Sequence, residues 1–102
     1  MSHNEEFRRR IMEDRRLVIL RYLDDEPDGR MSVSLMTDAL EIMSHRVPRT
    51  TVLADAGYLE GLGLLCVEYV GSVPILRLTG RGADVAKGLI EVPGVKKPAR
   101  GE

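Results

Sequence analysis

A short segment, RVPRTT, gathers basic and hydroxyl side chains at the point where a helix is predicted to begin. Pro48 suits the first turn of a helix, because its missing N–H costs nothing there. Arg46 lies just before this helix, and Arg49, Thr50 and Thr51 lie within its first turn. An arginine can pair bidentately with a guanine edge, while threonine hydroxyls and the amides of a helix start can hold phosphate. These residue types in this order indicate contact with double-stranded DNA.

The rest of the same predicted helix offers little for reading bases. Its next outward positions are Leu53, Ala54 and Gly57, which reach nothing beyond a thymine methyl group. A small apolar surface of this kind equally suits a protein partner. Two interpretations therefore stay open: a DNA-binding protein, or a non-catalytic interaction module that binds no DNA.

Outside the start of this helix, few basic residues are candidates for contact with DNA. The predicted hairpin turn, VGSVP, contains none, and Arg77 follows it on the returning strand. Lys96 and Lys97 come near the C-terminus and can supply further phosphate contacts, so all three join the candidate DNA-binding residues. Five other arginines alternate with acidic residues and are predicted to form a solvated helix face: Arg8, Arg9, Arg10, Arg15 and Arg16.

No pattern in the chain predicts catalysis, a metal site or a cofactor. The single Cys66 and the two histidines, His3 and His45, lack the spacing of metal ligands. The sequence GRG at 80–82 resembles a dinucleotide loop only superficially, because Val85 stands where the third glycine belongs. The acidic run DDEPD reads as a solvated turn rather than a pair of catalytic carboxylates. We therefore expect that the chain is not an enzyme.

The apolar patterns predict four helices and one two-stranded hairpin. Helices are expected at 4–23, from Ser32 or Ser34 to 44, at 48–62 and at 80–90, with strands at 64–70 and 74–79. This order is that of a winged helix-turn-helix domain, an α+β fold that is mainly helical. The domain is expected to span 1–90, followed by a flexible basic tail at 91–102 that has almost nothing to bury.

The first predicted helix has two separate apolar faces. Met12, Leu17, Ile19, Leu20 and Leu23 fill one broad arc, and a second arc holds Phe7, Ile11, Val18 and Tyr22. A helix in a small domain needs only one such face. The second face therefore predicts either a homodimer interface or packing under the C-terminal helix.

The overall composition is that of an ordinary globular domain. The chain has 102 residues, of which 43% are hydrophobic and 30% charged, and its formal net charge is -1. It contains no apolar run long enough to span a membrane, and the start MSHNEEFRRR lacks the apolar segment of a signal peptide. We expect a cytoplasmic protein with no membrane partner.

Four segments carry a resemblance to a known family: EDRRLVILRYL, TTVLADAGYLEGLGLLCVE, LRLTGRGADVAKG and VPGVKKP. Together they resemble the small winged-helix proteins of Mu-like bacteriophages and prophages, which are labelled as similar to the arsenical-resistance repressors. The resemblance runs from about residue 12 to 98 and implies a winged-helix fold and a phage context. The resemblance implies no particular activity. The helix order and the polar start of the third helix lead us to expect a transcriptional regulator or an accessory factor in a DNA transaction, and under the second interpretation the partner is a phage or host protein.

Overall fold

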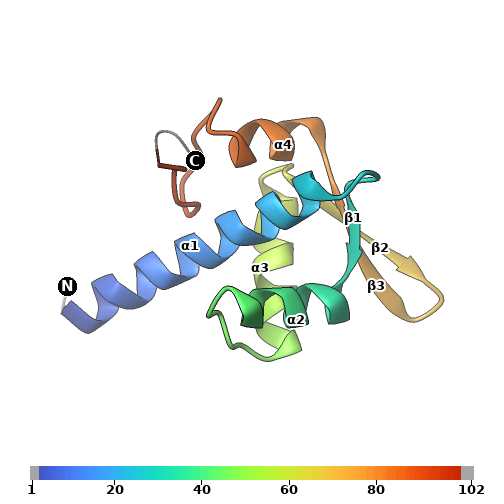
Figure 1. Ribbon diagram of the computed structural model, residues 1–102, viewed down its shortest axis with the longest axis horizontal. Helices are drawn as coiled ribbons and strands as arrows, with labels where there is room; N and C mark the ends of the chain where they lie inside the picture. The colour runs from blue at the N-terminus through green and yellow to red at the C-terminus, as the bar shows by residue number, and fades with distance from the viewer. Residues whose placement is uncertain (1–2, 100–102) are drawn as a thin grey trace.

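The computed structural model describes residues 3–99, which fold into four helices and three strands (Figure 1). In chain order they are α1 (His3–Asp25), β1 (Arg30–Ser32), α2 (Val33–Ile42), α3 (Arg49–Gly61), β2 (Leu65–Val70), β3 (Val73–Leu78) and α4 (Gly80–Ala86). The predicted α+β class with mainly helical content is confirmed. None of the helices within residues 3–99 is both long and apolar enough to cross a membrane.

The sheet has three antiparallel strands in the order β1-β3-β2, so the predicted two-stranded hairpin is wrong by one strand. β1 is the strand that the sequence did not predict, and it pairs with β3 so that Arg30 lies opposite Arg77. Gly29, with a φ of +66°, turns the chain between α1 and β1, and its carbonyl accepts a hydrogen bond from the Leu78 amide. A strand of three residues is too short to show the alternation by which strands are recognised.

The core is formed where α1, α2 and α3 meet the inner face of the sheet. Its fully buried side chains are Ile19, Leu20, Leu23, Met36, Leu40, Leu59, Leu64, Leu65, Leu76, Val33 and Val52. The expected arc of α1 supplies Ile19, Leu20 and Leu23, and α3 supplies Val52 and Leu59 from the stripe of residues that faces inward. The α3 helix is thereby fixed on one side, and its other side faces outward.

Hydroxyl caps and left-handed glycines set the ends of the shorter helices. Ser32 accepts a hydrogen bond from the Leu35 amide at the start of α2, and Thr79 accepts one from the Gly82 amide at the start of α4. α3 ends ahead of Gly63, whose φ is +76°. The last helix ends at Ala86, four residues before its predicted end at 90, because the chain turns at Gly88 with a φ of +79°.

The expectation that residues 91–102 have almost nothing to bury is wrong for the part that the structure describes. Val92 is only 9% exposed, and Val95 packs against the core cluster. The Lys96 amide donates a hydrogen bond to the Glu13 carbonyl of α1 at 3.1 Å. The segment therefore lies along α1 and packs against the core (Figure 1). Residues 100–102 lie outside the described part.

Candidate nucleic-acid interface

The start of α3 presents the candidate DNA-binding residues to solvent. Pro48 precedes the helix in an extended conformation, and its carbonyl accepts a hydrogen bond from the Thr51 amide at 3.0 Å. Arg49 and Thr50 are exposed and Thr51 is half-buried. The first turn of α3 contains no acidic residue that would repel a phosphate. Arg49 and Thr50 are therefore placed where a duplex can reach them.

Most of the charged candidates are neutralised by a carboxylate. The pairs are Arg46 with Glu41 at 3.1 Å, Arg77 with Glu68 at 3.2 Å, Lys96 with Asp14 at 3.4 Å and Lys97 with Glu91 at 2.8 Å. Arg49 differs from these four, because within residues 3–99 no carboxylate pairs with it. Arg49 is therefore the candidate whose charge is most available to a nucleic acid.

A second basic group lies on the sheet, where Arg30 and Arg77 share Glu68. Arg77 donates a hydrogen bond to one carboxylate oxygen of Glu68 at 3.2 Å, and Arg30 lies 3.5 Å from the other oxygen. That second oxygen is buried and has no hydrogen-bond partner in the described structure, so its contact with Arg30 is a long ion pair. The sequence did not single out Arg30 because β1 was not predicted, yet the β1–β3 register places it beside Arg77.

The structure does not bring Lys96 and Lys97 together with the start of α3. Their segment contacts α3 through Tyr58, whose hydroxyl donates to the Pro93 carbonyl at 2.8 Å. Tyr58 lies near the end of α3, and Figure 1 shows the C-terminal segment on the opposite side of α1 from α2. The two lysines therefore lie away from Arg49.

A buried charged network holds α3 against α1. The Nε atoms of Arg15 and Arg16 donate to the two carboxylate oxygens of Asp55, the latter at 3.1 Å. Only 11% of each arginine side chain and 4% of the Asp55 side chain are exposed. The prediction of a solvated face is therefore wrong for Arg15 and Arg16, although it holds for Arg8, Arg9 and Arg10, which are exposed.

Tyr58 extends this network to the C-terminal segment. The Arg16 guanidinium lies 3.9 Å above the centre of the Tyr58 ring, and its Nη1 donates to the Gly94 carbonyl at 3.1 Å. A Cβ atom at Gly94 would lie only 2.3 Å from the Tyr58 hydroxyl oxygen, so no other residue fits there unchanged. The last turns of α3 are thus fixed to both α1 and the C-terminal segment, whereas its first turn stays exposed.

The sequence contained a signal for the buried Asp55. Asp55 shares the spacing of the inward stripe formed by Val52, Ala56 and Leu59, and an acidic residue on an apolar stripe needs a buried partner. The arginines that meet it are 39 and 40 positions away in the chain, so the pairing itself could not be predicted.

Asp14 joins the turn before α3 to the C-terminal segment. His45, which is 8% exposed, lies 2.7 Å from one carboxylate oxygen, and Lys96 lies 3.4 Å from the other. Burial of Asp14 raises the pKa of its carboxyl, but the hydrogen bonds and charges of His45 and Lys96 outweigh burial and hold that pKa below 3.8. The carboxylate therefore stays ionised and anchors both segments.

The remaining candidate surfaces divide into exposed and packed residues. Leu53 on α3 is half-buried against the core, so only Ala54 and Gly57 remain as its small outer surface. The turn between β2 and β3 instead exposes larger apolar side chains: Tyr69 is 64% exposed, Val70 63% and Val73 46%. The turn contains no basic residue, as predicted, and its exposed side chains are apolar.

The four residues of the predicted dimer interface occupy two different settings. Phe7 is 63% exposed and Ile11 is half-buried, both on the first half of α1. Val18 is 9% exposed within the core cluster, and the Tyr22 hydroxyl donates to the Ala39 carbonyl of α2 at 3.0 Å. Part of this face is therefore packed within the chain, and part is open.

Comparison with known proteins identifies a related phage protein. No family model and no solved structure matches the chain. It is 40% identical over 88 residues to the uncharacterized protein gp26 of Escherichia phage Mu, a match that spans 86% of this chain and 91% of the phage protein. This match confirms the phage affiliation expected from the sequence. The likeness to arsenical-resistance repressors stays a prediction. The chain belongs to the family of the phage Mu protein gp26.

Proposed function

We propose that this phage-family protein is a winged helix-turn-helix protein that binds double-stranded DNA through the start of α3. In this role it acts as a transcriptional regulator or as an accessory factor in a DNA transaction. The order α2, turn, α3, β2, β3 supports the proposal, because α3 lies outward beside a hairpin that can contact the same duplex. β1 supports it further by tying the beginning of α2 to the hairpin.

The observation that carries the proposal is the asymmetry of α3. Its later turns are fixed by Asp55 and Tyr58, whereas Arg49 and Thr50 at its start are exposed and Arg49 lacks an ion pair within residues 3–99. A rigid helix with an available arginine at its exposed end can carry that arginine into a major groove. Arg30 and Arg77 on the sheet exceed their shared Glu68 by one charge, and they are the further cationic groups that this proposal assigns to phosphate contacts.

The Arg49→Ala variant is expected to bind duplex DNA more weakly. Loss of one arginine contact costs about 1–3 kcal/mol, which is roughly a fivefold to 150-fold rise in the dissociation constant. Fluorescence anisotropy at low salt measures this change. Lys97→Ala is the matched control, because it removes the same charge at an exposed position away from the start of α3 and should leave binding nearly unchanged. An equal loss in both variants would place the DNA-binding site elsewhere.

A second candidate function is an interaction module that docks a phage or host protein, and the apolar turn of the hairpin favours it. Tyr69, Val70 and Val73 together form an exposed apolar patch of a kind that marks protein contacts. The net charge of -1 is also unusual for a dedicated DNA-binding protein.

The Tyr69→Asp variant tests this second candidate. If the hairpin docks a protein, the chain immobilised on a resin should retain a protein from phage-infected, nuclease-treated cells that the variant does not retain. Phe7→Asp, at a similarly exposed aromatic residue on α1, should still retain it. Recovery of nucleic acid before nuclease treatment, with no protein that depends on Tyr69, would contradict the interaction module.

A further inference from the structure

Three charged side chains lie together on one face of the sheet. The β1–β3 register sets Arg30 opposite Arg77, and side chains that lie opposite each other point to the same face. Glu68 joins them, because it lies two positions from Cys66, the β2 residue opposite Arg77. Leu76, the neighbour of Arg77 on β3, points to the other face and is fully buried. The charged side chains therefore lie on the face away from the core, where each is between 38% and 44% exposed.

Glu68 compensates two like charges. Cations directly opposite each other on neighbouring strands repel, and the Glu68 carboxylate offsets this repulsion by contacting both. Its contact with Arg77 is a hydrogen bond of 3.2 Å, whereas Arg30 lies 3.5 Å from an oxygen that has no hydrogen-bond partner within residues 3–99. The group therefore has a net charge of +1, and one of its two ion pairs is loose.

The two arginines keep N–H donors that no protein acceptor uses within residues 3–99. A guanidinium carries five N–H groups in a planar fork. Arg77 donates through its Nε to Glu68, and the Arg30 side chain makes an ion pair but no hydrogen bond. Because both side chains are partly exposed, an anion from outside can reach the remaining donors. A phosphate suits them, since its oxygens accept hydrogen bonds from two guanidinium groups at once.

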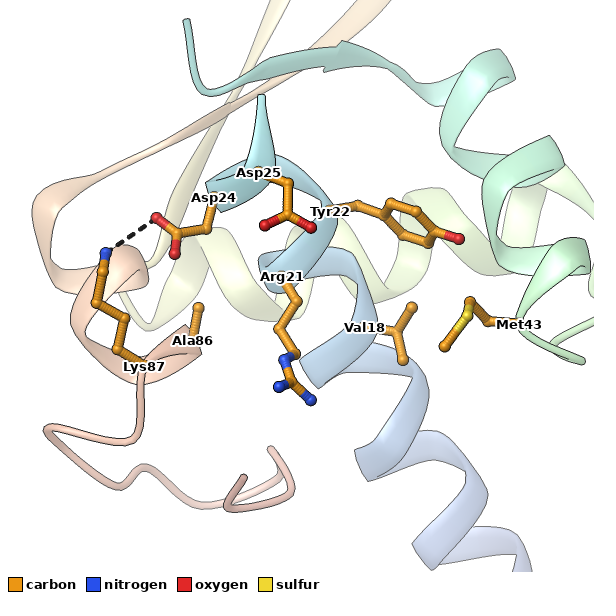
Figure 2. Close-up of a pocket in the computed structure, with 8 residues that line it drawn as sticks. All are labelled: Val18, Arg21, Tyr22, Asp24, Asp25, Met43, Ala86 and Lys87. Carbon is orange, nitrogen blue, oxygen red and sulfur yellow. Dashed lines mark hydrogen bonds and ion pairs between the residues drawn. The ribbon is translucent and has the colours of Figure 1, made fainter. Parts of the chain in front are cut away.

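Two other ion contacts show what is particular about Glu68. Lys87 and Asp24 form a pair of one cation and one anion at 3.1 Å (Figure 2), so no net charge is left there to attract a phosphate. Asp55 contacts two arginines, but only 4% of its side chain is exposed, so no phosphate can take its place. Glu68 combines two arginine partners with a position that a phosphate can reach.

We propose that Glu68 is an internal counter-ion of the DNA-binding surface, which a backbone phosphate of the duplex displaces from Arg30 and Arg77. This rests on the proposed function, because it concerns the phosphate contacts that the function assigns to these arginines. The exchange is favourable in energy. An exposed ion pair in water contributes little, whereas neutralising a phosphate on DNA also releases condensed counter-ions.

The internal counter-ion raises the share of binding that depends on base sequence. Contacts to phosphates hold any duplex, whereas Arg49 at the start of α3 is the candidate for reading bases. A carboxylate that competes with phosphate weakens the first kind of contact and leaves the second unchanged. Glu68 thereby limits binding to duplexes that lack the preferred sequence.

The Glu68→Gln variant tests the proposal by fluorescence anisotropy with a mixed-sequence duplex at several salt concentrations. Glutamine keeps the shape of the side chain and an acceptor oxygen for Arg77, but it carries no charge. The dissociation constant should fall about fivefold, which is the effect of one unit charge at about 4 Å in water. The log–log slope against salt should steepen by up to about 0.9. The gain should be equal for duplexes of different sequence, because their phosphates are the same.

Glu91→Gln is the matched control. It removes the same charge and releases Lys97, a cation away from the start of α3, from an ion pair of 2.8 Å. Because charges are screened beyond about 10 Å at 0.1 M salt, this variant should change the dissociation constant by less than about twofold. A chain that binds DNA but gains no more from Glu68→Gln than from Glu91→Gln would overturn the internal counter-ion and leave the proposed function standing. If neither the unaltered chain nor Glu68→Gln binds DNA, both proposals are wrong.

A second measurement asks whether Glu68 acts through the two arginines. Arg30→Gln and Arg77→Gln together remove the cations that Glu68 contacts. Adding Glu68→Gln to this double variant should therefore change affinity no more than Glu91→Gln does. A gain as large as that in the unaltered chain would mean that Glu68 repels DNA from a distance, and it would contradict the counter-ion role. Circular dichroism and urea unfolding of each variant show whether the sheet is kept.

Discussion

The Asp55→Ala variant is expected to lose about 3–5 kcal/mol of unfolding free energy, because it leaves two buried guanidinium groups without their shared carboxylate. Arg15 and Arg16 both donate to Asp55, and little of any of the three side chains is exposed. A single domain has a total stability of about 5–15 kcal/mol, so the loss is a large part of it. Urea unfolding at neutral pH, followed by circular dichroism, measures the change.

Asp38→Ala is the matched control for this loss. Asp38 is an exposed aspartate within α2, so its replacement should change the unfolding free energy by no more than about 0.5 kcal/mol. A similarly small effect at Asp55 would show that the charged network does not hold α3 against α1. Loss of the charged network would also affect function, because the proposed DNA contacts depend on a fixed orientation of α3.

The Gly82→Ala variant is expected to lose about 3 kcal/mol or to fail to fold, because no space exists for a methyl group at this position. A Cβ atom at Gly82 would lie 1.9 Å from the Leu64 carbonyl oxygen and 2.7 Å from a methyl group of Leu78. The carbonyl belongs to the backbone and also accepts a hydrogen bond from the Thr79 amide, so it cannot move away cheaply. Thermal unfolding measures the loss.

Gly80→Ala provides a control within the same helix. A Cβ atom at Gly80 would meet nothing within 4 Å, and its φ is not in the left-handed region. This variant should therefore be as stable as the unaltered chain or more stable by up to about 1 kcal/mol. Equal losses at the two glycines would mean that α4 does not approach β2 as closely as described. The GRG sequence thus contains one glycine required by helix-to-strand contact rather than a dinucleotide loop.

The helices and the hairpin strands could be predicted because their signals are local. Thr79 caps α4, Pro48 precedes α3 and Gly63 lies beyond its end, and each acts on neighbouring backbone. The starts predicted for these two helices, at 48 and 80, therefore agree with the structure to within one residue. β1 could not be predicted, since its three residues become a strand only by pairing with β3, more than 40 positions later in the chain. The packing of residues 91–99 was missed for the same reason: Val92, Gly94 and Lys96 have partners on α1 and α3, not nearby in sequence.

Only the local features of the candidate site could be predicted. The exposure of Arg49 and Thr50 follows from their place at a helix start, which the sequence reveals. The pairing of Arg46 with Glu41 and of Arg77 with Glu68 reduces their value as DNA contacts, and it depends on how helices and strands are brought together. Lys96 and Lys97 were included for their charge alone, and the fold places their segment against the later turns of α3 rather than its start.

Titration of the unaltered chain onto a fluorescent duplex at several salt concentrations tests the central claim of DNA binding most directly. Binding is expected at low salt, with a log–log slope of about -0.9 for each phosphate that the protein neutralises. The contributors would be Arg49 at the start of α3 and the arginines of the sheet. An anisotropy that stays constant with mixed-sequence and phage-derived duplexes, even at about 50 mM salt, would contradict the claim.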